Sequence, residues 1–349
     1  MKLCTILGAR PQFVKAAVLS SVIAEHSDLN EIIIYTGQHF DANMSSVFFD
    51  ELNIPRPHYN LGIGGGSHGQ NTGRMIESIE NTLIKEDPDW LVVYGDTDST
   101  LAGAIAAAKL HIPIAHIEAG LRSFNRKMPE EINRILTDHI SELLFTPTKI
   151  ATNNLMKEGM SKKVHQVGDI MLDAALFYKN RTLDIPDLII HDEFILCTIH
   201  RAENTDNMDR LTNICKAINF LAKDIQIILP IHPRTKKILA SADLNIRNVT
   251  LIDPISYLQM LGLLKKCTLV ITDSGGLQKE SFFFRKPCVT MRDETEWTEL
   301  IDLGINILAG SDTEQIIIAV QRMRFITVEN NVTLYGDGTA AHKIIGLLL

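Results

Sequence analysis

Short runs of β-branched and aliphatic residues recur along the chain, and between them apolar positions repeat with the spacing of amphipathic helices. In the first half we expect strands at residues 2–7, 31–35, 90–94 and 114–117. The same rhythm restarts in the second half, with expected strands at residues 194–198, 225–230, 249–252, 269–272, 288–291 and 305–308. Such alternation predicts an α/β protein with two Rossmann-like parallel-sheet domains.

A segment at residues 178–192 interrupts this rhythm with Pro, Asp and Asn, as a surface linker does. We therefore predict an N-terminal domain at residues 1–178 and a C-terminal domain at residues 190–335. The apolar tail, residues 339–349, is expected to form a helix that packs on one of the two domains. Ligands of open parallel sheets lie beyond the carboxyl ends of the strands, so two facing domains would form a deep cleft.

Composition narrows the function classes. The 349 residues, 45% hydrophobic and 22% charged, suit two folded domains of ordinary size. A net charge of −8 argues against nucleic-acid binding, and no segment reaches the roughly 18 apolar residues of a membrane span. The start of the chain resembles a first strand more than a signal peptide. Five widely spaced cysteines without a Cys-x-x-Cys pair indicate reduced core thiols and a cytoplasmic location.

The loop after the first strand contains one glycine, Gly8, where a dinucleotide site would have the spaced Gly-x-Gly-x-x-Gly triplet. A nicotinamide or flavin cofactor is therefore not expected. Arg10 and Lys15 lie near the start of the next helix, where they could hold a phosphate or polarise a substrate oxygen. Alternatively, they are solvated basic residues at an ordinary helix start.

A polar cluster follows the strand at residues 90–94 and leads into an alanine-rich helix. Asp98 and Ser99 suit the structural role of helix caps. Asp96 lies next to a glycine at the strand end, so it is the better candidate for chemistry.

Glu118 stands at the end of the next strand, and Glu130 and Glu131 open the helix that follows. The two helix acids also suit a first helical turn electrostatically, which is their structural alternative. Asp96, Glu118 and Glu130 nevertheless follow neighbouring strands, so we expect them to converge. Converging carboxylates raise one another's proton affinity, which is how general acids and bases arise at neutral pH.

The second domain has two His-containing loops, His200-Arg201 and His232-Pro233-Arg234, each after a strand. A single His is more often structural, but two with neighbouring arginines indicate an anionic ligand such as a diphosphate. The acidic residues are dispersed and the histidines lack ligand spacing, so no metal site is expected.

The strongest local signal is a strand that runs into Ser274, Gly275 and Gly276, with Glu280 one helical turn later. The glycines would free backbone N–H groups at a helix start for phosphate oxygens. A carboxylate at Glu280 could bind both hydroxyls of a ribose. The alternative, a capped helix with a tight turn, does not explain why Glu280 lies on a face that is predicted to be buried.

Together, the motifs resemble the non-hydrolysing UDP-N-acetylglucosamine 2-epimerases over nearly the whole chain. They are Gly8-Ala9-Arg10-Pro11 with Lys15, Gly95-Asp96-Thr97, Glu118-Ala119-Gly120-Leu121-Arg122, Pro129-Glu130-Glu131-Ile132-Asn133-Arg134, His200-Arg201, Asp273-Ser274-Gly275-Gly276 with Glu280, and Tyr335-Gly336-Asp337-Gly338. Each is weak alone, and seven in order are specific.

The resemblance implies a glycosyltransferase-B-like fold with an interdomain active site and a C-terminal helix that returns to the first domain. It implies conversion of UDP-N-acetylglucosamine to UDP-N-acetylmannosamine: the C2 proton is removed while UDP leaves C1, and both are returned to a 2-acetamidoglucal intermediate. No redox cofactor is needed, and relatives suggest a homodimer. The product would serve surface polysaccharide biosynthesis.

The resemblance also implies roles for individual residues. The catalytic group would comprise Asp96 and Glu118 as acid and base, with Glu130, His200 and Lys15. Groups that bind the UDP-sugar would be Arg10, Arg134, Arg201, His232, Ser274, Gly275, Gly276, Glu280 and Arg292.

Three departures from the family pattern bear on the substrate. Gln38-His39-Phe40-Asp41 replaces a Gln-His-Arg-Glu-Met motif that helps to bind an activating second UDP-sugar, and Thr295-Glu296-Trp297-Thr298-Glu299 replaces Thr-Glu-Arg-Pro-Glu. Gly168-Asp169-Ile170-Met171 replaces the usual Gly-Asn-Thr. These changes, with Arg122-Ser123-Phe124-Asn125, resemble the branch that acts on UDP-2,3-diacetamido-2,3-dideoxy-glucuronic acid. Its carboxylate would need a further cation, which Arg126, Lys127 or Arg292 could supply.

Three other function classes remain open at this point. A hydrolysing epimerase would release UDP and free N-acetylmannosamine, and a glycosyltransferase would need an acceptor before it released UDP. A non-enzymatic sugar-nucleotide sensor would bind without turnover.

Overall fold

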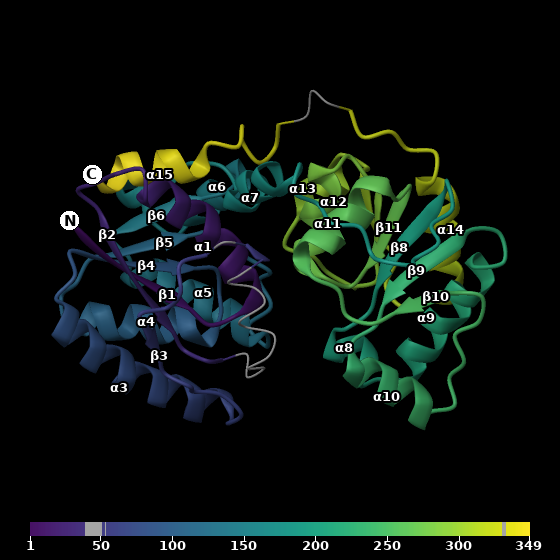
Figure 1. Cartoon of the computed structure of the whole chain (residues 1–349), viewed down its shortest axis with the longest axis horizontal. Helices are drawn as coiled ribbons and strands as arrows, with labels where there is room; N and C mark the ends of the chain where they lie inside the picture. Colours follow the sequence, from purple (N-terminus) through teal and green to yellow (C-terminus); the bar gives the residue numbers. More distant parts are fainter. Residues whose placement is uncertain (39–50, 53, 330–332) are drawn as a thin grey trace. The chain divides into compact units, whose positions relative to one another are not determined.

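The computed structural model describes residues 1–38, 51–52, 54–329 and 333–349. The chain divides into two compact units (Figure 1). Unit 1 comprises Met1–Phe177 and Thr333–Leu349, and unit 2 comprises Tyr178–Val332. Residues 39–41, part of the segment that replaces the family's Gln-His-Arg-Glu-Met motif, lie outside the described residues.

Unit 1 contains a seven-stranded sheet in the order β3-β2-β1-β4-β5-β6-β7, and its described strand pairs are all parallel. The strands are β1 (Lys2–Leu7), β2 (Asn30–Tyr35), β3 (Tyr59–Asn60), β4 (Trp90–Tyr94), β5 (Ile114–Ile117), β6 (Leu143–Thr146) and β7 (Val164–Gln166). The reversal of strand order beside β1 brings the loops after β1 and β4 together at the carboxyl edge of the sheet, where ligands of such sheets bind.

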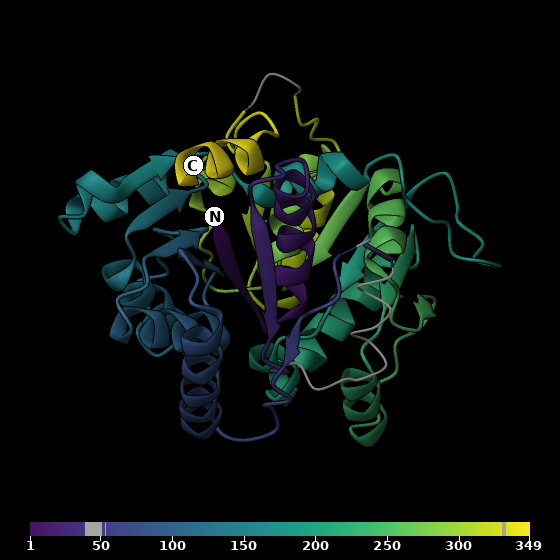
Figure 2. The same cartoon turned by 60° about the vertical axis from the view of Figure 1, so that its left-hand side comes forward.

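The helices of unit 1 cover both faces of its sheet (Figures 1 and 2). They are α1 (Arg10–Ile23), α3 (His68–Glu86), α4 (Asp98–Lys109), α5 (Pro129–Ile140), α6 (Lys149–Lys157), the 3-10 turn η1 (Ser161–Lys163), α7 (Ile170–Tyr178) and α15 (Ala340–Leu348). Alternate strand residues such as Cys4 and Ile6 pack with Met75 and Ile79 of α3 and with the alanines of α4. Because both faces are covered, the strands are apolar throughout.

The C-terminal helix α15 belongs to unit 1 and packs against α1. Its first turn has no side-chain cap of its own, but Asp173 of α7 accepts a hydrogen bond from the backbone N–H of Ala341 at 2.8 Å. In the segment that precedes α15, the carbonyl of Tyr335 accepts a hydrogen bond from the backbone N–H of Asp169 at 2.8 Å. These contacts fix the returning chain on the unit that contains the N-terminus.

Unit 2 contains a six-stranded sheet in the order β10-β9-β8-β11-β12-β13, again with parallel pairs. Its strands are β8 (Phe194–Thr198), β9 (Gln226–Pro230), β10 (Thr250–Ile252), β11 (Leu269–Thr272), β12 (Cys288–Thr290) and β13 (Asn306–Leu308). Its helices are α8 (Ala202–Thr205), α9 (Met208–Leu221), α10 (Pro233–Ser241), α11 (Tyr257–Lys266), α12 (Gly275–Phe283), α13 (Thr298–Asp302) and α14 (Thr313–Met323). Within the described part of the chain, no helix combines the length and apolar character that a membrane span needs.

All ten expected strands are present within one or two residues of their predicted ends. Three strands at the flanks of the unit 1 sheet, β3, β6 and β7, were not predicted. They have two to four residues each, too few to show a period in the sequence.

Candidate active site

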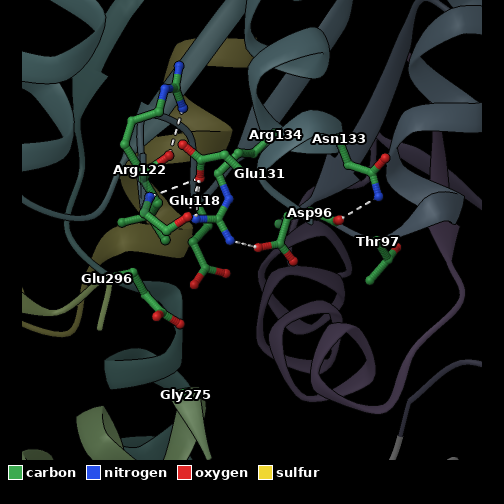
Figure 3. Close-up of polar contacts among 12 residues, drawn as sticks. Asp96, Thr97, Glu118, Arg122, Glu131, Asn133, Arg134, Gly275 and Glu296 are labelled. Carbon is green, nitrogen blue, oxygen red and sulfur yellow. Dashed lines mark hydrogen bonds and ion pairs between the residues drawn. The ribbon is translucent and has the colours of Figure 1, made fainter. Parts of the chain in front are cut away.

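The turn after β4 places Asp96 at the carboxyl edge of the unit 1 sheet. Gly95 adopts a left-handed backbone conformation with φ +61°, which glycine tolerates without strain. The Asp96 side chain is about one-third exposed at 32% and forms an ion pair with Arg134 of α5 (Figure 3). The backbone carbonyl of Asp96 accepts a hydrogen bond from Asn133 Nδ2 at 2.9 Å, so both the turn and the carboxylate are held from α5.

The caps predicted for α4 were wrong. The N-cap is Thr97, whose side-chain oxygen accepts from the backbone N–H of Thr100 at 3.2 Å. Asp98 is buried as the first helical residue, and its carboxylate contacts Asn133 Nδ2 at 3.1 Å and His68 Nδ1 at 2.7 Å. Thr97 is also an effective cap, and the sequence alone could not rank the adjacent candidates.

Glu118 occupies the turn after β5 in a left-handed conformation, φ +71°, which is uncommon for a residue with a side chain. Its backbone N–H and that of Ala119 both donate to the carbonyl of Phe145, at 3.1 and 3.0 Å. The carboxylate is 9% exposed and forms an ion pair with Lys15 Nζ. Strained residues of this kind persist only where the surroundings fix them, and they concentrate at functional sites.

The Asp96 and Glu118 turns are adjacent. A Cβ placed on Gly95 would lie 3.5 Å from Lys15 Nζ and 3.6 Å from Glu118 Oε2. The structure therefore brings Lys15, Asp96, Glu118 and Arg134 to one part of unit 1. The predicted convergence of three acids is confirmed for Asp96 and Glu118, and stays a prediction for Glu130.

The two glutamates in the first turn of α5 differ in burial. Glu130 is exposed, whereas Glu131 is 1% exposed and accepts from the backbone N–H groups of Ser123 and Phe124 at 2.9 and 3.0 Å. Arg134 NH1 also donates to Glu131 at 3.1 Å (Figure 3). Glu131 thus shapes the loop after Glu118 and orients the arginine that contacts Asp96, a role that the sequence did not reveal.

Gln12 is a second residue whose importance the sequence did not show. This buried side chain of α1 accepts from the N–H groups of Gly8 and Ala9, at 2.8 and 3.0 Å, and donates to the carbonyl of Tyr94 at 2.7 Å. It therefore ties the loop after β1 to the loop after β4. Arg10 is the first residue of α1, and its side chain is outside the described part of the structure.

In unit 2, Asp273 organises the loop after β8. It is fully buried and accepts from the backbone N–H groups of His200 and Arg201 at 3.1 Å, and His200 Nδ1 lies 3.1 Å from its Oδ1. Burial alone would raise the pKa of Asp273, but the hydrogen bond and charge of His200, with Arg201 N–H and Asn204, outweigh it and lower this pKa. The His200 ring stays half exposed and is available to a ligand.

The phosphate-type turn of unit 2 has the expected local form. Ser274 is the N-cap of α12, and its side chain accepts from the N–H of Leu277 at 3.3 Å. Gly275 and Gly276 are the first two helical residues, so their N–H groups have no partner within the helix. An added Cβ on Gly275 would lie 2.7 Å from Glu296 Oε1, whereas at Gly276 it would meet nothing within 4 Å.

Glu280 lies one turn along α12 and is 7% exposed. Burial first, and then the nearby charge of Glu280, raise the pKa of Tyr257 well above its ordinary range, so the phenol stays protonated close to this carboxylate. Arg292, after β12, is 1% exposed and donates to Glu296 at 2.9 Å. A buried cation and a helix start thus lie in the same part of unit 2, which suits an anionic group.

The second His-containing loop has a structural use. His232 is the N-cap of α10, with Nδ1 accepting from the N–H of Arg234 at 3.2 Å, and Arg234 forms an exposed ion pair with Asp206 at 2.5 Å. Arg201 is the N-cap residue of α8. Among the described residues, no group of three or more His, Cys, Asp or Glu side chains could hold a metal ion.

A family model described as UDP-N-acetylglucosamine 2-epimerase matches residues 21–349. The chain is 53% identical over 348 residues to the UDP-2,3-diacetamido-2,3-dideoxy-D-glucuronate 2-epimerase of Pseudomonas aeruginosa, covering 99% of this chain and 98% of that relative.

Two solved structures are similar over the whole chain. The UDP-GlcNAc 2-epimerase of Methanocaldococcus jannaschii, in complex with UDP-GlcNAc and UDP, gives a TM-score of 0.89 at 43% identity, covering 100% of this chain and 99% of that one. The enzyme of Neisseria meningitidis, bound to UDP-GlcNAc, gives 0.90 at 32% identity, with coverage of 100% and 99%.

Proposed function

Because the chain belongs to the non-hydrolysing UDP-N-acetylglucosamine 2-epimerase family, and is therefore an isomerase, we propose that it inverts carbon 2 of the 2-acetamido sugar of a UDP-sugar. The first candidate reaction is the conversion of UDP-N-acetylglucosamine to UDP-N-acetylmannosamine. The observation that carries the proposal is the pair of carboxylates, Asp96 and Glu118, on adjacent turns of unit 1.

The chemistry requires such a pair. The C2 proton of this sugar is not next to a carbonyl, so its removal is coupled to departure of UDP from C1 by anti elimination. The resulting 2-acetamidoglucal then regains UDP and a proton on the opposite face. Asp96 and Glu118 are assigned as the acid and base. Arg134 and Lys15 respectively hold these two carboxylates in position, and the exposed Glu130 assists at the sugar.

The leaving diphosphate needs cations and N–H donors where its charge develops. For this role we assign the half-exposed His200, Arg10, Lys15 and the N–H groups that open α12. Glu280 would bind the ribose hydroxyls. Further contacts to the UDP-sugar are assigned to Arg134, Arg201, His232, Ser274, Gly275, Gly276 and Arg292.

A second candidate substrate is UDP-2,3-diacetamido-2,3-dideoxy-glucuronic acid. The 53% identity over 348 residues to an epimerase named for this substrate favours it. Its sugar carboxylate would need a cation, and Arg126 and Lys127 lie exposed in the loop that follows the Glu118 turn.

Each nucleotide is incubated separately with the protein in deuterated water and followed by proton NMR. We expect loss of the C2 proton signal and appearance of the 2-epimer, without accumulation of UDP. The better substrate is the one with the higher kcat/KM. Stoichiometric UDP release would instead select a hydrolysing epimerase, and binding without exchange would select a sensor. Asp96→Asn should abolish exchange and retain UDP binding, with the exposed Asp302→Asn as the matched control.

We further propose a homodimer, supported by an unusual helix. The outer face of α5 carries Ile132, Leu136 and Ile140, exposed by 46%, 45% and 38% at four-residue spacing. An apolar stripe of this kind typically packs against another helix. Light scattering of the wild type and of Leu136→Glu tests this, since the substitution should yield monomers.

The proposed location is the cytoplasm, supported by five cysteines that are all free and buried. A nucleotide sugar made there would supply surface polysaccharide biosynthesis. Fractionation of the native cells tests the location.

A further inference from the structure

His116 lies in the sheet core between the two turns that carry Asp96 and Glu118. It belongs to β5, is fully buried, and uses both ring nitrogens. Nε2 lies 2.8 Å from the backbone carbonyl oxygen of Gly95, and Nδ1 lies 2.7 Å from Oδ1 of the equally buried Asp138 of α5. A single side chain therefore connects the turn after β4 to helix α5.

The second oxygen of Asp138 completes the connection. Its Oδ2 accepts from the backbone N–H of Gly120, at 3.2 Å, and from Arg122 NH1, at 2.7 Å. Gly120 follows Glu118 in the same turn. Asp138 thus contacts the Glu118 turn directly and the Asp96 turn through His116.

The charge state of this pair follows from its hydrogen bonds. A backbone carbonyl only accepts, so His116 Nε2 must carry a proton. Burial would raise the pKa of Asp138, but the hydrogen bond and charge of His116 and the charge of Arg122 outweigh burial and lower this pKa. The Arg122 guanidinium, 2.7 Å from Oδ2, favours the carboxylate form of Asp138, which only accepts. Each ring nitrogen of His116 thus faces an acceptor, and a ring that donates from both nitrogens is an imidazolium.

The surrounding charges balance. Arg122 donates to Glu158 through Nε and NH2, at 2.8 and 2.7 Å, besides its bond to Asp138. Two cations, His116 and Arg122, thus face two anions, Asp138 and Glu158, from β5, its following turn, α5 and the end of α6. His116, Asp138 and Arg122 are buried, whereas Glu158 is exposed, and buried charges are stable only when each has a partner.

Both turns need such support. Gly95 and Glu118 have φ of +61° and +71°, and the second value is strained for a residue with a Cβ. The Gly95 N–H donates to the carbonyl of Ile117 at 3.0 Å, which links one turn to the strand before the other. Hydrogen bonds from a charged donor are about twice as strong as neutral ones, so an imidazolium restrains the Gly95 carbonyl more than a neutral ring would.

We propose that His116 and Asp138 form a buried imidazolium–carboxylate pair that positions the Asp96 and Glu118 turns for proton transfer at the sugar. Both are positioning residues, since they act through the backbone of the two turns. The inference rests on the proposed epimerase function for its consequence in turnover, and on the hydrogen bonds and neighbouring charges for the charge state.

The Asp138→Asn variant separates charge from shape. An Asn Oδ1 at the position of Oδ2 can still accept from Gly120 and Arg122, and its Nδ2 can donate to a neutral His116 Nδ1, so every hydrogen bond is kept while the imidazolium is lost. Asp173→Asn is the matched control, because Asp173 is also a buried carboxylate of unit 1 that accepts from a backbone N–H.

Three measurements test the pair. In ¹⁵N-histidine NMR at neutral pH, His116, assigned with a His116→Gln variant, should be doubly protonated in the wild type and singly protonated in Asp138→Asn. Hydrogen exchange at the Gly95 and Gly120 amides should accelerate in Asp138→Asn and not in Asp173→Asn. On the substrate that turns over, Asp138→Asn should lower kcat on the order of ten-fold, with KM nearly unchanged.

A singly protonated His116 in the wild type, or wild-type kcat and exchange in Asp138→Asn, would overturn the proposal. The NMR measurement on the wild type needs no variant to fold. If neither nucleotide is epimerised, the proposed function fails, and the NMR and exchange results still decide whether the charged pair holds the two turns.

Discussion

Two adjacent glutamates at the start of α5 provide a sharp test of how this site is built. Glu131 is buried, and its carboxylate accepts from Ser123 N–H, Ser123 Oγ, Phe124 N–H and Arg134 NH1 at 2.9 to 3.1 Å. Glu130 is exposed. We predict that Glu131→Gln mainly destabilises unit 1, whereas Glu130→Gln lowers turnover without a loss of stability.

The expected loss of stability in Glu131→Gln follows from the number of acceptor oxygens that the substitution leaves. A glutamine has one acceptor oxygen, so its amide group would face at least one N–H donor of the loop, which costs about 1–3 kcal/mol. Removing one partner of a buried ion pair costs about 3–5 kcal/mol. In Glu131→Gln, Arg134 keeps its ion pair with Asp96, so only part of that cost applies. We therefore expect a loss of about 4 kcal/mol for Glu131→Gln. An exposed substitution such as Glu130→Gln should change stability by less than about 0.5 kcal/mol.

The assay uses the two tryptophans of the chain. Trp90 lies on β4 of unit 1, and Trp297 lies in unit 2. In a Trp297→Phe background, Trp90 fluorescence during urea unfolding reports on unit 1. With m of about 1–3 kcal/mol/M, the midpoint for Glu131→Gln should fall by roughly 2 M. Turnover of Glu130→Gln should fall by about 10²-fold or more if it assists proton transfer.

Equal midpoints for the two variants would refute this reasoning, because the four hydrogen bonds of Glu131 would then contribute nothing measurable. A midpoint for Glu130→Gln that falls as far as that of Glu131→Gln would show that the first turn of α5 responds to charge rather than to specific bonds. Unchanged turnover in Glu130→Gln would remove that residue from the proposed site.

Three further outcomes are expected. Gly120→Ala should destabilise unit 1 by about 3 kcal/mol or more in thermal unfolding. Gly120 has φ +81°, and an added Cβ would lie 2.4 Å from the carbonyl oxygen of Ala151. Gly69→Ala is the control that should be tolerated, since its Cβ would meet nothing within 4 Å. Asp138 and Asp273 have folded pKa values below the ordinary value of about 3.9, so their stabilisation is complete above about pH 4 and is lost as the pH falls through the folded values, which acid unfolding of the Asn variants can measure. The five thiols should resist iodoacetamide until the protein is unfolded, because burial raises their pKa values and keeps them protonated. The pKa rises to about 11 at Cys215, to about 12 at Cys4, Cys267 and Cys288, and well above the ordinary value at Cys197.

The sequence was sufficient for the fold class and the family. The predicted α/β class with two parallel-sheet domains of glycosyltransferase-B-like fold is confirmed, and so is membership of the non-hydrolysing epimerase family. Long apolar runs identify central strands because both faces of a parallel sheet are covered. Flanking strands such as β7, with three residues, form because neighbouring strands pair with them. The local sequence pattern does not predict such pairing.

Of the three acids expected to converge, Asp96 and Glu118 lie on adjacent turns, because the carboxyl ends of parallel strands share one edge, and the place of Glu130 beside them stays a prediction. The strand-end rule could not find Gln12, Glu131 or the pair of His116 and Asp138. These residues act from within the fold, and a buried polar side chain looks the same in a sequence as a solvated one. Only the count of donors and acceptors around it shows that the surrounding turns depend on it.

Helix α5 shows a physical reason why buried polar residues cannot be recognised from the sequence pattern. Its apolar residues recur with helical period, and the usual reading puts such a stripe in the core. Here the stripe faces outward, and the residues that the helix buries are polar: Glu131, Asn133, Arg134, Thr137 and Asp138. Periodicity defines two faces of a helix but does not say which one is inside. When a site needs buried acids and cations, the polar face turns inward, and the exposed apolar face is left for another surface.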